Sequence, residues 1–127
     1  MKTYNGCGKK KCAIARVFLK IKKNNIRINN FKINEYFNKK INYKIIFDPI
    51  RITNSKNLDI KINVKGGGKN SQIMAIRNGL AKALLNYNKI YKKILSDNKL
   101  LTRDSRVVER KKIGKIKSRK SKQFSKR

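Results

Sequence analysis

The alternation of apolar and polar residues is most regular over residues 58–65. Its apolar members are Leu58, Ile60, Ile62 and Val64, and a polar residue follows each of them. Successive side chains of a β-strand point to opposite faces of the sheet, so this period gives one apolar and one polar face. The pattern therefore predicts a strand with one buried and one exposed face.

Residues 13–21 form a second stretch of this kind, with an apolar residue at every odd position. Residues 22–25 are polar and predict a turn. Ile26, Arg27 and Ile28 then predict the returning strand of a hairpin. The Asn5–Gly8 segment before these strands is interpreted as a polar, glycine-bearing start.

Residues 71–88 have a helical period instead. Ile73, Ile76, Leu80 and Leu84 are spaced by three or four residues, as is Tyr87 after them. This spacing places them on one face of an α-helix. The polar residues of the segment are expected on its other faces: Arg77, Asn78 and Lys82.

Two less regular segments complete the pattern. Residues 91–97 predict a further short helix, and residues 33–46 predict short helical turns that end before Pro49. Strands and helices that share one core indicate an α/β fold, with a small mixed sheet and helices on one side. We expect a globular domain over residues 1–102 and an extended basic tail over residues 103–127.

The densest positive charge of the chain lies in the tail. Residues 103–127 hold 12 Lys and Arg and two acids, Asp104 and Glu109, within a chain of net charge +30. The tail has too few apolar residues to offset the entropy of folding by itself. Its cations repel one another until polyanions surround them, and nucleic acid is the polyanion of matching charge density.

The composition disfavours several other classes. Histidine is absent, the six acids form no close pair, and Cys7 and Cys12 lack the further ligands of a zinc site. We therefore expect no catalysis, metal, cofactor or small-molecule substrate, and two free, reduced thiols. No apolar run approaches the roughly 20 residues of a membrane span. A basic protein on an acidic membrane surface is a weaker alternative, because the densest charge lacks a helical period.

The glycine run Gly66–Gly68 lies between the predicted strand and helix, where phosphate-binding loops occur. The dinucleotide pattern is incomplete, because Ser71 stands in the third glycine position and no acid follows at the required distance. A tight turn is the simplest interpretation. Because Lys65 and Lys69 flank it, we favour a turn whose backbone N–H groups also bind RNA phosphates.

Two further features indicate RNA contact. Lys9, Lys10 and Lys11 follow Gly8 directly and, beside a cationic tail, favour phosphate binding over a merely solvated run. Phe124 has only polar and charged neighbours, so we expect it to pack into an RNA crevice. The other aromatic residues are more typical of a core than of a base-stacking surface: Phe18, Phe31, Tyr36, Phe37, Tyr43 and Phe47.

Four segments together resemble one family. They are TRDSRVVERKK (residues 102–112) with Gly114 and the terminal QFSKR, YNGCGKKKCAIARV (residues 4–17), VKGGG (residues 64–68) and AIRNGLAKALL (residues 75–85). They resemble bacterial-type small-subunit ribosomal protein nine over nearly the whole chain. The resemblance implies a fold like the second domain of small-subunit ribosomal protein five, with an unusual left-handed βαβ crossover.

The resemblance also implies a place and partners. The body would bind small-subunit ribosomal RNA in the subunit head, beside other head proteins. The tail would thread through RNA to the peptidyl site, where Lys126 and Arg127, positioned by Ser125, would contact the anticodon stem-loop of transfer RNA. The family start lies almost at Met1, which leaves no room for a transit peptide. With the Lys, Asn and Ile bias, this implies a bacterium with an A+T-rich genome or an organelle (plastid, apicoplast or mitochondrion).

Charge, motifs and resemblance together give the predicted ribosomal RNA contacts: Lys9, Lys10, Lys11, Arg16, Lys65, Gly66, Gly67, Gly68, Lys69, Arg77, Arg103, Arg106, Arg110, Lys111, Lys112, Lys115, Lys117, Arg119, Lys120, Lys122 and Phe124. Two other classes stay open on the residues alone. One is the basic protein subunit of a transfer-RNA-processing ribonuclease, although its arginine-rich helix motif is not found. The other is a non-specific DNA-compacting protein.

Overall fold

The computed structural model of the chain describes residues 2–37 and 41–123. Its strands are β1 (Tyr4–Lys10), β2 (Ala13–Ile21), β3 (Asn25–Ile28), β4 (Phe31–Lys32) and β5 (Leu58–Lys65). They form one five-stranded sheet in the order β1-β2-β5-β3-β4. The pairs β1–β2, β2–β5 and β3–β4 are antiparallel, and β3–β5 is parallel. The predicted mixed sheet is therefore confirmed.

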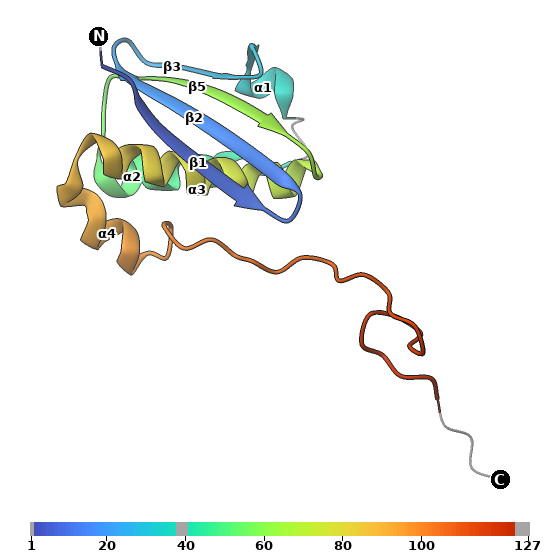
Figure 1. The fold of residues 1–127 in the computed structure, drawn as a ribbon. Coiled ribbons are helices and arrows are strands. Elements are labelled where there is room, and N and C mark those ends of the chain that lie inside the picture. Colours follow the sequence, from blue (N-terminus) through green and yellow to red (C-terminus); the bar gives the residue numbers. More distant parts are fainter. Residues whose placement is uncertain (1, 38–40, 124–127) are drawn as a thin grey trace.

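The helical segments are α1 (Ile33–Tyr36), η1 (Lys44–Phe47), α2 (Asp48–Thr53), α3 (Lys69–Tyr87), η2 (Lys89–Tyr91) and α4 (Lys92–Asp97). Figure 1 shows α2 and α3 across one face of the sheet, with the tail leaving the body beyond α4. The α/β fold with helices on one side is confirmed, and it is consistent with the fold of the second domain of ribosomal protein S5. Below, residues 2–102 are called the body and residues 103–123 the tail.

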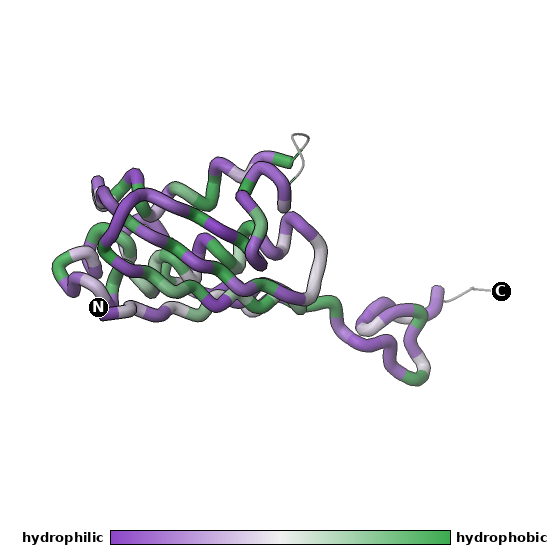
Figure 2. Tube along the Cα trace, turned by 90° about the horizontal axis from the view of Figure 1, so that it is seen from above, coloured by the Kyte–Doolittle hydropathy of each residue, from purple (hydrophilic) through white to green (hydrophobic). Residues whose placement is uncertain are grey.

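The core lies between α3 and the two longest strands. Along β5 the residues Leu58, Ile60, Ile62 and Val64 are buried, and β2 has the same alternation from Ala13 to Leu19. The two strands pair in full register, from Ile14 opposite Lys65 to Ile21 opposite Leu58. Each strand thus turns its apolar face to the helices, as predicted. Figure 2 shows this alternation as changes between purple and green along the tube.

The predicted hairpin between residues 13–21 and 26–28 is wrong. Strand β3 pairs in parallel with β5, with Ile26 opposite Ile60, and β5 lies between β2 and β3. The hairpin partner of β2 is β1, part of which was interpreted from its sequence as a polar, glycine-bearing start. The strand was missed because two of its inward positions, Gly6 and Gly8, are glycines and give no apolar alternation.

Those glycines have a steric reason. A Cβ atom on Gly8 would lie 1.8 Å from the carbonyl oxygen of Ala75 and 2.4 Å from the nitrogen of Gly79, both in α3. A Cβ atom on Gly6 would lie 2.1 Å from the carbonyl oxygen of Gly79. The backbones of β1 and α3 therefore touch, and only residues without a side chain fit between them.

The helix predictions are mostly confirmed. Helix α3 covers the predicted segment almost to its ends, and residues 89–97 form η2 and α4. The turns predicted over residues 33–46 are found as α1 and as the start of η1. Pro49 does not end a helical region but occupies the first turn of α2. Backbone N–H groups in the first turn of a helix have no partner within the helix, so proline loses no hydrogen bond there. Asn78, expected on an outer face, is buried and donates to the Leu100 carbonyl at 2.9 Å.

Parallel pairing of β3 with β5 requires a crossover connection. The segment between these strands supplies it and contains α1, η1 and α2. A hydrogen bond ties this crossover to α3, because the Tyr36 hydroxyl of α1 donates to the Gln72 Oε1 atom of α3 at 2.8 Å. The left-handed sense of the crossover stays a prediction.

The tail has no helix and no strand over residues 103–123. The tail projects away from the body (Figure 1), and residues 112–121 fold back into a small loop. A bridge between Lys115 and Ser121, together with Gly114 at a φ of 80°, closes this loop. No sequence pattern predicted this loop, because its contacts are polar and its apolar residues are scattered.

Candidate nucleic-acid interface

The glycine run and the lysine-rich hairpin turn lie at the same end of the sheet. Gly66 and Gly67 have φ angles of 82° and 64°, which confirms the predicted tight turn. A Cβ atom on Gly66 would lie 2.4 Å from the carbonyl oxygen of Cys12 in the β1–β2 turn. Lys11, which precedes Cys12, therefore lies beside the glycine loop. Two predicted phosphate-binding segments, more than 50 residues apart in sequence, are brought together.

Gln72 fixes the position of this loop and was missed by the sequence analysis. It is 7% exposed, and its Nε2 atom donates to the Gly66 carbonyl at 3.0 Å. Its Oε1 atom accepts from the Tyr36 hydroxyl. The sequence did contain a signal of this role. Gln72 lies one turn before Ile76 and is therefore a polar residue on the apolar face of the predicted helix. The predicted ligand Lys69 follows the loop, with its Nζ atom 3.6 Å from the centre of the Tyr36 ring.

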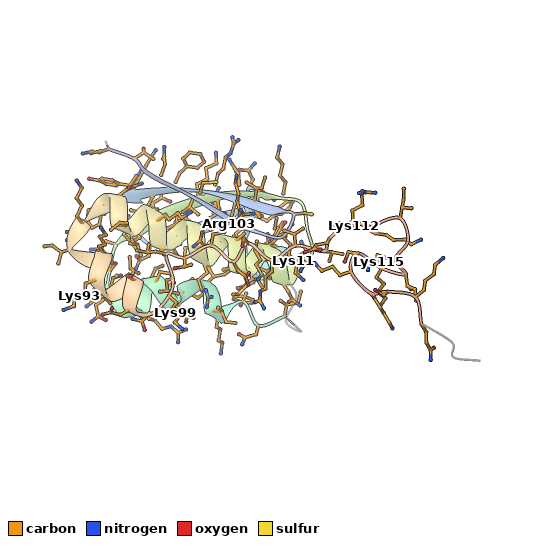
Figure 3. All side chains as sticks on the ribbon, turned by 60° about the horizontal axis from the view of Figure 1, so that its bottom comes forward. Lys11, Lys93, Lys99, Arg103, Lys112 and Lys115 are labelled. Atoms are coloured by element: carbon orange, nitrogen blue, oxygen red, sulfur yellow. The ribbon has the colours of Figure 1, made fainter. Side chains whose placement is uncertain are left out.

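A second group of predicted cations surrounds the point where the tail leaves the body. Lys10 of β1, Arg77 of α3, and Arg103 and Arg106 of the tail line a hollow of about 610 Å³. Asp104 joins them, because its Oδ2 atom lies 2.5 Å from the Lys10 Nζ and 2.6 Å from an Arg106 nitrogen. We call this hollow the tail root. In Figure 3, Arg103 lies over the body, whereas Lys112 and Lys115 lie on the projecting tail.

The acids of the tail are held in their charged form. Hydrogen bonds from Arg106 and then Lys10 lower the pKa of Asp104 well below its usual range. A hydrogen bond from Arg119 likewise lowers the pKa of Glu109, and the same pairs raise the pKa of Arg106 and Arg119. The Arg106 and Arg119 side chains are exposed, so solvent and salt weaken their pairs with Asp104 and Glu109. Each acid nevertheless fixes the position of a neighbouring cation.

The tail cations have few partners. Within the described residues, Lys10 and Arg106 pair with Asp104, and Arg119 pairs with Glu109. The remaining predicted contacts of the tail are exposed and make no ion pair within the described part of the chain: Arg103, Arg110, Lys111, Lys112, Lys115, Lys117, Lys120 and Lys122. Phe124, Ser125, Lys126 and Arg127 lie outside the described residues.

Three other predicted contacts lie on the sheet face that faces away from the helices. Lys9, Arg16 and Lys65 are exposed there, on β1, β2 and β5. We call this surface the open face. Phe18 also lies on it and is only partly buried, and Phe31 is 55% exposed. The expectation that both belong to the core is therefore wrong, whereas Phe37 is fully buried.

Three simpler features complete the description. Cys7 and Cys12 are exposed free thiols, as predicted. Over residues 2–37 and 41–123, no three His, Cys, Asp or Glu side chains gather closely enough to hold a metal ion. None of the helices in the same residues has the length and apolar character to cross a membrane.

The body is thus a small α/β domain with cations at its glycine loop, tail root and open face, followed by a cationic tail. These features are typical of a nucleic-acid-binding protein with an extended basic arm. The family "Ribosomal protein S9/S16" matches residues 8–127, which is nearly the whole chain. The chain belongs to this family, which confirms the resemblance to small-subunit ribosomal protein nine; the bacterial type stays a prediction.

Family membership gives the general role. The chain is a ribosomal protein, part of a ribonucleoprotein, and binds ribosomal RNA next to other ribosomal proteins in translation. Its location is the ribosome. Members of the family are generally not enzymes. The match supports neither the ribonuclease subunit nor the DNA-compacting protein.

Proposed function

We propose that this chain is a structural constituent of the small ribosomal subunit that binds ribosomal RNA in the subunit head. The glycine loop, the tail root and the tail supply the cations, and the last residues contact transfer RNA in the peptidyl site. The proposal includes no catalytic step and no small-molecule substrate. Its setting is a bacterium with an A+T-rich genome or an organelle.

The observation that carries this proposal is the tail itself. Its described residues bury no apolar side chain, and Val108 and Ile113 are 86% and 102% exposed. A segment that buries so little gains its order from a partner. Most of its cations have no acid beside them, so the partner is a polyanion. The family match continues through the tail to Arg127, which favours a role specific to the ribosome.

The positions of the cations suggest different roles for the body and the tail. Lys10, Asp104 and Arg106 attach the start of the tail to the body, which sets the direction in which it leaves. Lys11, Lys69 and the N–H groups of the glycine loop offer phosphate contacts at one end of the sheet. The body would hold one region of ribosomal RNA while the tail reaches another. Neighbouring head proteins would cover part of the remaining surface.

The test of the transfer RNA contact is deletion of Ser125, Lys126 and Arg127. Subunits should assemble almost normally but hold peptidyl-site transfer RNA more weakly, because two cations are lost at the tip. The matched control is the Lys120→Gln/Lys122→Gln variant, which removes two tail cations and leaves the tip intact. Filter binding of transfer RNA to purified subunits measures the difference. Equal retention by truncated and full-length subunits would refute the contact.

The test of the ribosomal role is sedimentation of a cell lysate through sucrose at moderate and high salt. Co-migration with the small subunit at both salt concentrations is expected, because contacts within folded RNA are screened less than exposed ones. Migration with the large subunit, or with chromosomal DNA, would contradict the proposal.

A further inference from the structure

The open face contains one row of residues that runs across all five strands. Phe18 of β2 is directly opposite Asn5 on one side and Lys61 on the other. Lys61 is opposite Arg27, and Arg27 is opposite Lys32. Residues paired in this way share one face of a sheet. We call these five residues the Phe18 row; none of them was among the contacts predicted from the sequence.

The surroundings of the Phe18 row are strongly cationic. Seven exposed Lys and Arg side chains lie on the open face: Lys9, Arg16, Lys20, Arg27, Lys32, Lys61 and Lys65. Asp59 is the acid found on the same face, and among the described residues it forms no ion pair with any of them. Like charges placed opposite each other, as Lys61 and Arg27 are, destabilise a sheet. This arrangement therefore indicates a polyanionic partner.

The aromatic ring lies between two hollows of this face. One, of about 580 Å³, is lined by Phe18 together with Lys20, Arg27, Lys61 and Asn63. The other, of about 440 Å³, is lined by Phe18 together with Asn5, Cys7 and Arg16. Each hollow thus combines part of the ring, at least one cation and a side-chain amide. Flat bases, phosphates and base edges are the groups that these three kinds of side chain bind.

We propose that the open face binds unpaired nucleotides of ribosomal RNA, with a base stacked on Phe18. The cations of the Phe18 row and Arg16 contact the phosphates, and the amides of Asn5 and Asn63 hydrogen-bond to bases or riboses. Unpaired RNA fits better than duplex RNA, because paired bases are stacked on one another and leave no free face for the ring. The inference rests on the proposed function, since it assigns a further surface to the same RNA partner.

The first test replaces the ring in the full-length protein. Phe18→Leu keeps an apolar side chain but removes the stacking surface, and Phe31→Leu makes the same change on the opposite face of the sheet. Fluorescence anisotropy with a short unstructured uridine oligoribonucleotide measures affinity. Phe18→Leu should weaken binding by roughly 5- to 150-fold, the range for loss of one stacked base. Phe31→Leu should bind as the parent protein does, and equal affinities for the two variants would overturn the proposal.

The second test removes charge. In the Arg27→Gln/Lys61→Gln variant, the slope of log affinity against log salt should fall by about 1.4, or roughly 0.7 for each phosphate contact to a single strand. The control, Lys92→Gln/Lys93→Gln, removes two exposed cations from α4 instead. If both variants lowered the slope equally, binding would be a matter of total charge and the proposal would be wrong.

The third test identifies the occupant in the assembled particle. Cys7 lies on the open face opposite Arg16, so a photoreactive group attached to it in a Cys12→Ser variant samples this surface. Cross-linking to ribosomal RNA is expected. Cross-linking to a ribosomal protein would overturn the inference and leave the proposed function intact. If neither the labelled nor the unlabelled chain were found in small subunits, the proposed function itself would be wrong.

Discussion

The body and the tail both expose many cations, but among the described residues only the body has an apolar core. Every buried apolar residue of the described chain lies between Ala13 and Leu100. The tail carries Val107, Val108, Ile113 and Ile116, yet each is at least 45% exposed. The body is therefore stabilised by its own apolar contacts, whereas the tail is ordered by charge. One chain thus combines a domain that has an apolar core with an arm whose described residues bury no apolar side chain.

The largest expected effect tests how closely the body is packed. Gly8→Ala places a methyl group against the backbone of α3 and should lower the free energy of unfolding by about 3 kcal/mol or more. Gly68→Ala is the control, because a Cβ atom there has nothing within 4 Å; it changes only the N-cap of α3 and should cost at most about 1 kcal/mol. Urea denaturation measures both. Similar losses in the two variants would contradict the contact between β1 and α3.

The next prediction compares one type of residue in the two regions. Ile62→Ala removes a fully buried side chain and should cost about 2–5 kcal/mol of unfolding free energy. Ile113→Ala changes a fully exposed residue of the tail and should cost less than about 0.5 kcal/mol. The same urea titration checks this pair. A clear loss of stability in Ile113→Ala would mean that the tail packs on the body.

A smaller effect concerns the charges of the body. Raising the salt concentration should increase the free energy of unfolding of the isolated protein by up to about 1 kcal/mol, because it screens the repulsion across the open face. The Arg27→Gln/Lys61→Gln variant should show a smaller increase. Thermal unfolding at low and high salt, followed by circular dichroism, measures the difference. If the increase were the same in both proteins, these two cations would not contribute to the repulsion.

The smallest effect is the pH dependence of the tail root. Because its folded-state pKa is lowered, Asp104 stabilises this contact at any pH above the ordinary aspartate pKa, and the stabilisation is lost as pH falls through the lowered value. The Lys10 and Arg106 resonances should therefore stay constant from neutral pH down to about 4. Nuclear magnetic resonance titration measures this, with Asp104→Asn as the reference for the broken contact. A transition near pH 4 to 5 would contradict the lowered pKa.

The sequence predicted those elements whose buried faces are apolar. Residues 58–65 and 71–88 were predicted closely because their periods reflect burial directly. Strand β1 was missed because glycines replace the apolar residues where α3 approaches, and β3 was misassigned because β5, 30 residues later, lies between it and β2. Local patterns do not contain such distant pairings.

The candidate site was predictable as a list of cations but not as an arrangement. Composition and the resemblance indicated RNA and named Lys10, Arg77 and Arg106 as contacts. They did not indicate that these side chains line one hollow in which Lys10 and Arg106 pair with Asp104, nor that Gln72 fixes the glycine loop. Phe18 was assigned to the core as an aromatic residue, although the alternation over residues 13–21 already places it on the face opposite that of Val17 and Leu19.

The contact of β1 with α3 limits how this chain can change over generations. Because main chain meets main chain at Gly8, there is no neighbouring side chain that a second mutation could shorten to make room. A lineage whose codons drift towards lysine, asparagine and isoleucine can replace most of the surface, but it must retain glycine at this position.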